Sequence, residues 1–172
     1  ARLSLLVGVI FVNYLAGTGS INNTQTGDIS GKYPTFITPA GYAFSIWGLI
    51  YLGLLLFSLY QALPKNTERF TLVRTLYILN CAANCAWLYL WHYDRILSSL
   101  GVMFLLLGTL VLINQNLLKT ESNGADFWFA RLPFSIYFGW ITAATILNFT
   151  IALISLGVKA SDLTTNILAC VL

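Results

Sequence analysis

Long stretches without ionisable side chains constrain the fold of this chain more than any other feature. Four of them, residues 3–27, 33–64, 96–118 and 132–158, contain no Asp, Glu, Lys, Arg or His, and residues 75–93 contain only His92. A helix of about 20 apolar residues is long enough to cross the hydrocarbon core of a bilayer. The chain is therefore predicted to be a polytopic membrane protein.

The composition agrees with that prediction. Hydrophobic residues make up 58% of the chain and charged residues 9%, and the mean hydropathy is +0.76. A water-soluble domain needs a far more charged surface. The formal net charge of +3 is too small to suggest a nucleic-acid partner, so the expected surroundings are the lipid bilayer.

We predict an all-α, polytopic membrane helix bundle that forms a single transmembrane domain over residues 1–172. The five expected spans are residues 3–16, 40–63, 71–93, 97–118 and 127–156, and a possible sixth begins at about residue 161. The first loop, residues 17–39, is rich in Gly, Ser, Thr and Asn and is expected to be irregular. We therefore expect a multi-pass protein of an inner, thylakoid or organelle membrane.

The cations predict an orientation for these spans. Arg2, Lys65, Arg69, Arg74, Lys119 and Arg131 fall on one side of the membrane, whereas Lys32, Arg95 and Lys159 fall on the other. Because loops with more Lys and Arg stay inside, the N-terminus is predicted to be inside and the first loop outside.

Three spans carry aromatic and amide side chains at helical spacing. The candidate ligand-binding residues are Phe44, Trp47 and Tyr51 in the second span, Asn80, Asn84 and Trp87 in the third, and Pro133, Tyr137, Trp140 and Asn148 in the fifth. Lipid offers no partner for these amides, so the three faces should point at one another or at a ligand. Two interpretations remain open: interhelical packing, or a pocket for a large planar apolar ligand.

Groups needed for other chemistries are missing from the expected spans. No acidic or basic residue lies mid-membrane, which argues against a proton relay or an ion path. No catalytic or phosphate-binding motif occurs, and no metal site is expected, since Cys81 and Cys85 lack further ligands. His92 could be the axial ligand of a metallated tetrapyrrole, but we favour a polar residue at the membrane interface.

Three blocks of sequence resemble the tryptophan-rich sensory protein and translocator protein family (TspO/MBR). The first is residues 38–51, TPAGYAFSIWGLIY; the others are residues 80–87 with Asn80, Asn84 and Trp87, and residues 131–140, RLPFSIYFGW, continuing to Asn148. The chain looks closest to a divergent branch of this family with more than five helices.

The resemblance implies a five-helix bundle that binds porphyrins, and in some members sterols or aromatic drug-like molecules, in a pocket under the first loop. It implies that the candidate residues in the second, third and fifth spans line or support this pocket. The expected ligand is thus a porphyrin, a chlorophyll or another tetrapyrrole, with no obligatory cofactor. The first loop lacks Trp, so we expect binding rather than enzymatic porphyrin degradation.

Two functions therefore remain in view. The first is a non-enzymatic binder or sensor of planar lipophilic ligands, free-standing or as a homodimer. The alternative is an accessory structural subunit of a photosynthetic or respiratory membrane complex, holding pigment or lipid.

Small residues predict one close helix contact. Gly41, Ser45 and Gly48 in the second span, and Ala82, Ala83 and Ala86 in the third, would let the two backbones approach each other. The alternative is that Gly48 makes room for a ligand beside Trp47.

Overall fold

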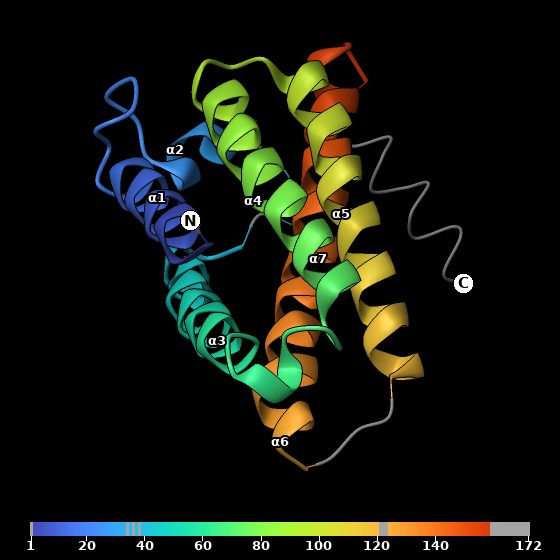
Figure 1. The fold of residues 1–172 in the computed structure, drawn as a ribbon. Helices are drawn as coiled ribbons and strands as arrows, with labels where there is room; N and C mark the ends of the chain where they lie inside the picture. Colours follow the sequence, from blue (N-terminus) through green and yellow to red (C-terminus); the bar gives the residue numbers. More distant parts are fainter. Residues whose placement is uncertain (1, 34, 36, 38, 121–123, 159–172) are drawn as a thin grey trace.

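The computed structural model describes residues 2–33, 35, 37, 39–120 and 124–158, which form a bundle of long helices (Figure 1). The long helices are α1 (Arg2–Gly17), α3 (Ile46–Tyr60), α4 (Thr71–His92), α5 (Ile96–Lys119) and α7 (Leu132–Ser155). Short helical segments are α2 (Thr26–Gly31), η1 (Gly41–Ser45), η2 (Pro64–Asn66), α6 (Gly124–Asp126) and η3 (Phe127–Arg131). The described residues contain no strand, and the all-α prediction is confirmed.

The long helices coincide with the five predicted spans, but they differ in apolar character. Among the described residues, three helical stretches are long and apolar enough to cross a membrane: Tyr42–Tyr60, Ile96–Lys119 and Gly124–Ser155. Helix α1 has only 16 residues, and α4 carries Asn80, Asn84 and His92 on its buried face. The predicted sixth helix lies outside the described residues.

The ends of two spans differ from the prediction. The second span begins as the 3₁₀ helix η1, and α3 ends at Tyr60, a few residues before Pro64. The fifth begins with α6 and the π-helix η3 before α7. Hydropathy marks the apolar stretch, whereas local backbone hydrogen bonding decides which kind of helix it forms.

Helix α5 packs against both α4 and α7, α3 packs on α7, and α1 lies against α4 and α3 (Figure 1). The core follows a helical stripe along α5, where Met103, Leu106, Leu110 and Ile113 are all 0% exposed. Apolar packing therefore holds α4, α5 and α7 together.

Polar side chains connect the same helices. The Asn80 Nδ2 donates to Thr109 Oγ1 at 2.8 Å between α4 and α5. The Asn148 Nδ2 donates to Ser99 Oγ at 3.1 Å between α7 and α5. Such amide contacts stabilise helix pairs where water cannot compete.

The predicted close approach of α3 and α4 at small residues is wrong. A Cβ atom added to Gly48 would meet no atom within 4 Å, and Ala82 and Ala86 are exposed. These two helices meet instead through rings, with the centroids of Phe57 and Tyr77 6.0 Å apart.

The close approach of α3 is to α7 rather than to α4. A Cβ added to Gly53 would lie 2.9 Å from the Cβ of Pro133. The two helices can come this close because Gly53 has no side chain and the ring of Pro133 is compact and rigid. Sequence periodicity identifies buried faces but not which helix covers each of them.

A buried carboxylate joins the chain segments at one end of the bundle. The Asp126 side chain, in a residue 3% exposed, accepts hydrogen bonds from Tyr60 OH at 2.8 Å and from Arg69 Nη2 at 2.9 Å. The hydrogen bond with Asp126 raises the pKa of the Arg69 guanidinium. This cluster connects the end of α3, the segment before α4 and the start of the last span.

Candidate ligand-binding cavity

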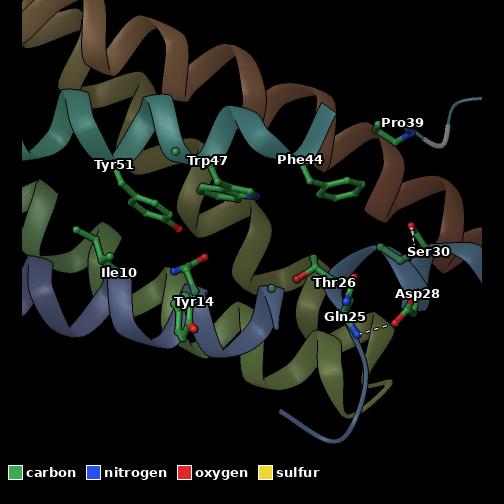
Figure 2. A pocket seen from close by; sticks show the side chains of 14 residues that line it. Ile10, Tyr14, Gln25, Thr26, Asp28, Ser30, Pro39, Phe44, Trp47 and Tyr51 are labelled. Carbon is green, nitrogen blue, oxygen red and sulfur yellow. Dashed lines mark hydrogen bonds between the residues drawn. The ribbon is translucent and has the colours of Figure 1, made fainter. Parts of the chain in front are cut away.

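A cavity of about 590 Å³ lies between α1 and α3, with α2 at one end (Figure 2). It is lined by Ile10, Asn13, Tyr14, Gly17, Gln25, Thr26, Gly27, Asp28, Ser30, Pro39, Phe44, Trp47, Gly48 and Tyr51. This volume falls within the range of pockets that take small organic ligands.

One wall of the cavity is aromatic. Phe44 at the end of η1 and Trp47 and Tyr51 on α3 follow a helical stripe, and Figure 2 shows them side by side along this helix. The rings of Trp47 and Tyr51 are stacked, with centroids 5.5 Å apart and planes 15° apart. Gly48 adds no side chain to this wall, which leaves room beside Trp47.

Helix α7 supports the aromatic wall from behind. The ring of Trp47 contacts Tyr137 at 6.0 Å and Trp140 at 6.3 Å, both edge to face. Phe44 also meets Trp140 edge to face at 5.8 Å. These contacts favour one orientation of each ring, so the wall is formed before any ligand arrives.

One polar side chain of the cavity wall, on α1, is hydrogen-bonded to a buried amide of α4. The Asn13 Nδ2 on α1, which lines the cavity, donates to Asn84 Oδ1 on α4 at 2.7 Å. Asn84 is 1% exposed, and its Nδ2 has no hydrogen-bond partner among the described residues; the same is true of the Tyr51 hydroxyl. A buried donor without an acceptor is rare in folded proteins. Of the two residues only Tyr51 lines the cavity, so its hydroxyl can serve a ligand there.

A second, much smaller cavity of about 30 Å³ lies behind Phe44 and Trp47. Its lining includes Trp87 and Trp91 of α4, whose rings stack at 5.6 Å, and Trp140 and Asn148 of α7. The buried Trp87 Nε1 has no hydrogen-bond partner among the described residues. Four of the five tryptophans of the chain thus surround the two cavities.

The segment around α2 is fixed on the end of α4. The Trp91 Nε1 donates to the Thr26 carbonyl at 3.1 Å, and Asn22 Nδ2 donates to the His92 carbonyl at 2.8 Å. Beyond α2, Tyr33 OH donates to Asp94 Oδ1 at 2.9 Å. Burial raises the pKa of Tyr33, and this hydrogen bond to Asp94 raises the pKa further. Helix α2 therefore closes the end of the cavity as part of the fold.

The structure brings most of the candidate residues to these cavities. Phe44, Trp47 and Tyr51 line the larger one, and Trp87, Trp140 and Asn148 line the smaller one together with Phe44 and Trp47. Tyr137 supports Trp47, and Asn84 is bonded to the cavity residue Asn13.

Two candidate residues lie elsewhere. Asn80 is hydrogen-bonded to Thr109 in the interface of α4 and α5, and Pro133 packs on Gly53. Sequence reasoning missed Asn13 and Thr26. Trp91 continues the helical spacing of Asn80, Asn84 and Trp87 but was not among the candidate residues. Asn13 carries the only side-chain amide within α1, which could have drawn attention to it.

His92 is buried at the end of α4, and its expected position at the level of the membrane interface stays a prediction. It is 0% exposed, because the chain around Asn22 covers the end of α4. Its Nδ1 lies 2.8 Å from the Leu88 carbonyl, so Nδ1 carries the proton there. His92 lines neither cavity, and the described residues contain no group of three His, Cys, Asp or Glu side chains suited to a metal.

A family model described as TSPO-like protein matches residues 1–172 of this chain. The match spans the cavity residues on all contributing helices. No curated protein and no solved structure matches the chain.

Proposed function

The chain belongs to the TSPO-like protein family, and on this premise we propose that it is a non-enzymatic membrane binder or sensor of tetrapyrroles or similar planar lipophilic molecules. Family membership and the long apolar helices establish an integral membrane protein. The ligand class is our inference from the cavity.

The aromatic wall of the larger cavity is the observation that carries this proposal. Phe44, Trp47 and Tyr51 present flat, supported rings to a space of about 590 Å³ (Figure 2). A planar ligand can lie along several rings at once, and each aromatic contact contributes about 0.5–1.5 kcal/mol beyond the area it buries.

Donors without a partner indicate that the ligand should carry a hydrogen-bond acceptor. The Tyr51 hydroxyl and the Asn84 Nδ2 each lack an acceptor among the described residues. Tyr51 lines the cavity, and a ligand that brings a carbonyl or carboxylate oxygen to its hydroxyl gains about 1–3 kcal/mol, which is the usual cost of leaving such a group unsatisfied. Tetrapyrroles with acidic or carbonyl substituents combine this acceptor with a planar ring system.

Ligand binding is tested with protoporphyrin IX and the protein in nanodiscs, following the porphyrin absorbance. We expect Trp47→Ala to weaken binding about ten-fold, equivalent to about 1.4 kcal/mol. Trp128→Ala is the matched control, because Trp128 is 62% exposed and lines neither cavity. Absence of binding at micromolar porphyrin, or equal losses in both variants, would contradict the proposal.

The proposal that the protein binds porphyrin without degrading it is tested separately. Protoporphyrin IX incubated with the protein in light and in darkness should be recovered with unchanged mass and yield relative to empty nanodiscs. A protein-dependent loss of porphyrin would indicate degradation instead.

The accessory-subunit alternative makes a different prediction about assembly. The outer face of α5 exposes Leu97, Phe104, Leu105 and Leu112, and such a surface suits lipid and a partner helix equally. Native electrophoresis of mildly solubilised membranes should show a free monomer or dimer if the chain is a sensor. Co-migration with a larger complex would favour the subunit.

A further inference from the structure

An apolar groove of about 340 Å³ lies on α3 where that helix meets the start of the last span. Its walls are formed by Leu49, Leu52 and Leu56 of α3 and by Trp128, Leu132 and Ile136 of η3 and α7. The larger cavity is lined by Phe44, Trp47, Gly48 and Tyr51 of the same chain stretch, so the groove uses a different face of α3.

Close helix packing forms the floor of the groove. Gly53 and Pro133 both line it, and a Cβ added to Gly53 would lie only 2.9 Å from the Pro133 Cβ, so α3 and α7 approach closely here. Leu49 and Leu52 above this floor are each 54% exposed. Both bounding stretches, Tyr42–Tyr60 and Gly124–Ser155, are apolar enough to cross a membrane, so the groove faces hydrocarbon.

The π-helix η3 closes one end of the groove. The wider turn at Phe127–Arg131 precedes α7, and Trp128 and Phe129 from this turn line the groove. Single π-helical turns within longer helices often mark functional positions. Exposed Trp side chains also favour the level of the lipid headgroups.

This end of the bundle is basic, whereas the opposite end is balanced. Among the described residues, the segments around η2 and η3 and the adjoining helix ends carry five cations, Lys65, Arg69, Arg74, Lys119 and Arg131, against the two anions Glu68 and Asp126. The end that holds α2 carries Lys32 and Arg95 against Asp28 and Asp94. Lys65 is exposed on η2, the short helix that follows α3 along the chain at this basic end of the bundle.

We propose that this groove binds one acyl chain of an acidic phospholipid, whose headgroup lies at the basic end of the bundle beside η2. The groove holds the chain by its shape and apolar lining, and the positive charge at its end selects an anionic headgroup. The site goes beyond the proposed ligand cavity and shares no lining residue with it.

Photolabelling in nanodiscs tests this site. Phosphatidylglycerol and phosphatidylcholine that carry a diazirine in one acyl chain are compared, and labelled peptides are identified by mass spectrometry. With phosphatidylglycerol we expect at least three-fold more label in the groove peptides of α3 and η3 than on the outer face of α5. The phosphatidylcholine label should show no such enrichment.

Two variants separate the groove from general lipid contact. Leu52→Phe fills the groove and should reduce its labelling at least three-fold, whereas Leu112→Phe on α5 should leave that labelling unchanged; these leucines are 54% and 51% exposed. Lys65→Gln should at least halve the preference for phosphatidylglycerol. Even labelling of α3 and α5, or equal enrichment of both lipids in the groove, would overturn the proposal.

Discussion

Gly48 and Gly53 lie five residues apart on α3, but a methyl group would meet different surroundings at each. At Gly53 it would come within 2.9 Å of the rigid Pro133 ring, whereas at Gly48 it would meet no atom within 4 Å. We expect Gly53→Ala to lower the free energy of unfolding by about 1–3 kcal/mol, as overpacking usually does. Gly48→Ala should not destabilise the protein. Denaturant unfolding in one detergent compares the two variants, and equal losses would contradict the close packing of Gly53 on Pro133.

A larger side chain at Gly48 tests the cavity itself. Gly48→Leu should fold, because its side chain would extend into empty space, but it should weaken protoporphyrin binding at least ten-fold by filling the space beside Trp47. A titration by porphyrin absorbance measures this effect, with Gly48→Ala as the control. A folded Gly48→Leu variant that binds as tightly as the parent would place the ligand elsewhere.

The sequence could not distinguish these two glycines. Both occur in an apolar helix, and small residues there are compatible with a helix contact and with a cavity. The aromatic stripe of Phe44, Trp47 and Tyr51 was more informative, because three rings at helical spacing must share one face.

On the scale of single helices, the amides of α4 divide into two roles. Asn80 is hydrogen-bonded to Thr109 of α5, whereas Asn84 accepts from Asn13 at the cavity. Asn80→Leu should cost about 0.6 kcal/mol of stability, and at most about 1.7, as measured for similar contacts in membranes. It should leave protoporphyrin binding unchanged, whereas Asn84→Leu should weaken that binding several-fold. Equal effects of the two variants on binding would show that the division is wrong.

Spacing alone could not reveal this division, because residues one turn apart occupy the same face of a helix. The buried face of α4 is broad, since α5 covers one side of it and α1 covers another. The burial of both amides was thus predictable, but their separate partners depend on the neighbouring helices.

At the basic end of the bundle, the Asp126 side chain stabilises the junction between helix ends. We expect Asp126→Asn to lower the free energy of unfolding by about 1–3 kcal/mol, because it removes the charged acceptor that Tyr60 and Arg69 share. Glu68→Gln also removes one negative charge at this end, but from an exposed position, and should have little effect on the free energy of unfolding. Thermal unfolding of both variants in detergent measures the difference. Equal stability of the two would indicate that the Asp126 cluster contributes little.

For the whole molecule, hydropathy predicted the all-α class and the positions of the five long helices because lipid imposes long apolar helices on a spanning chain. Their arrangement was not predictable in the same way. The position of α2 depends on contacts such as Asn22 with the His92 carbonyl, which join segments about 70 residues apart. Loops of polar small residues carry no pattern that specifies such partners.

Charge asymmetry along the bundle predicts its orientation in the membrane. The basic end around η2 should lie inside and α2 outside, because Lys and Arg are retained on the inner side. Cysteines introduced at Ser20 and Lys65, both exposed and at opposite ends of the bundle, test this with a membrane-impermeant maleimide. With the protein expressed in a bacterial inner membrane, Ser20→Cys should react in intact cells, whereas Lys65→Cys should react only after permeabilisation, and the parent protein gives the background from its own cysteines. The reverse pattern would contradict the orientation while keeping η1 and α3 as a span. Reaction of both cysteines from the same side would contradict that span, since only this helical stretch separates the two positions across the bilayer.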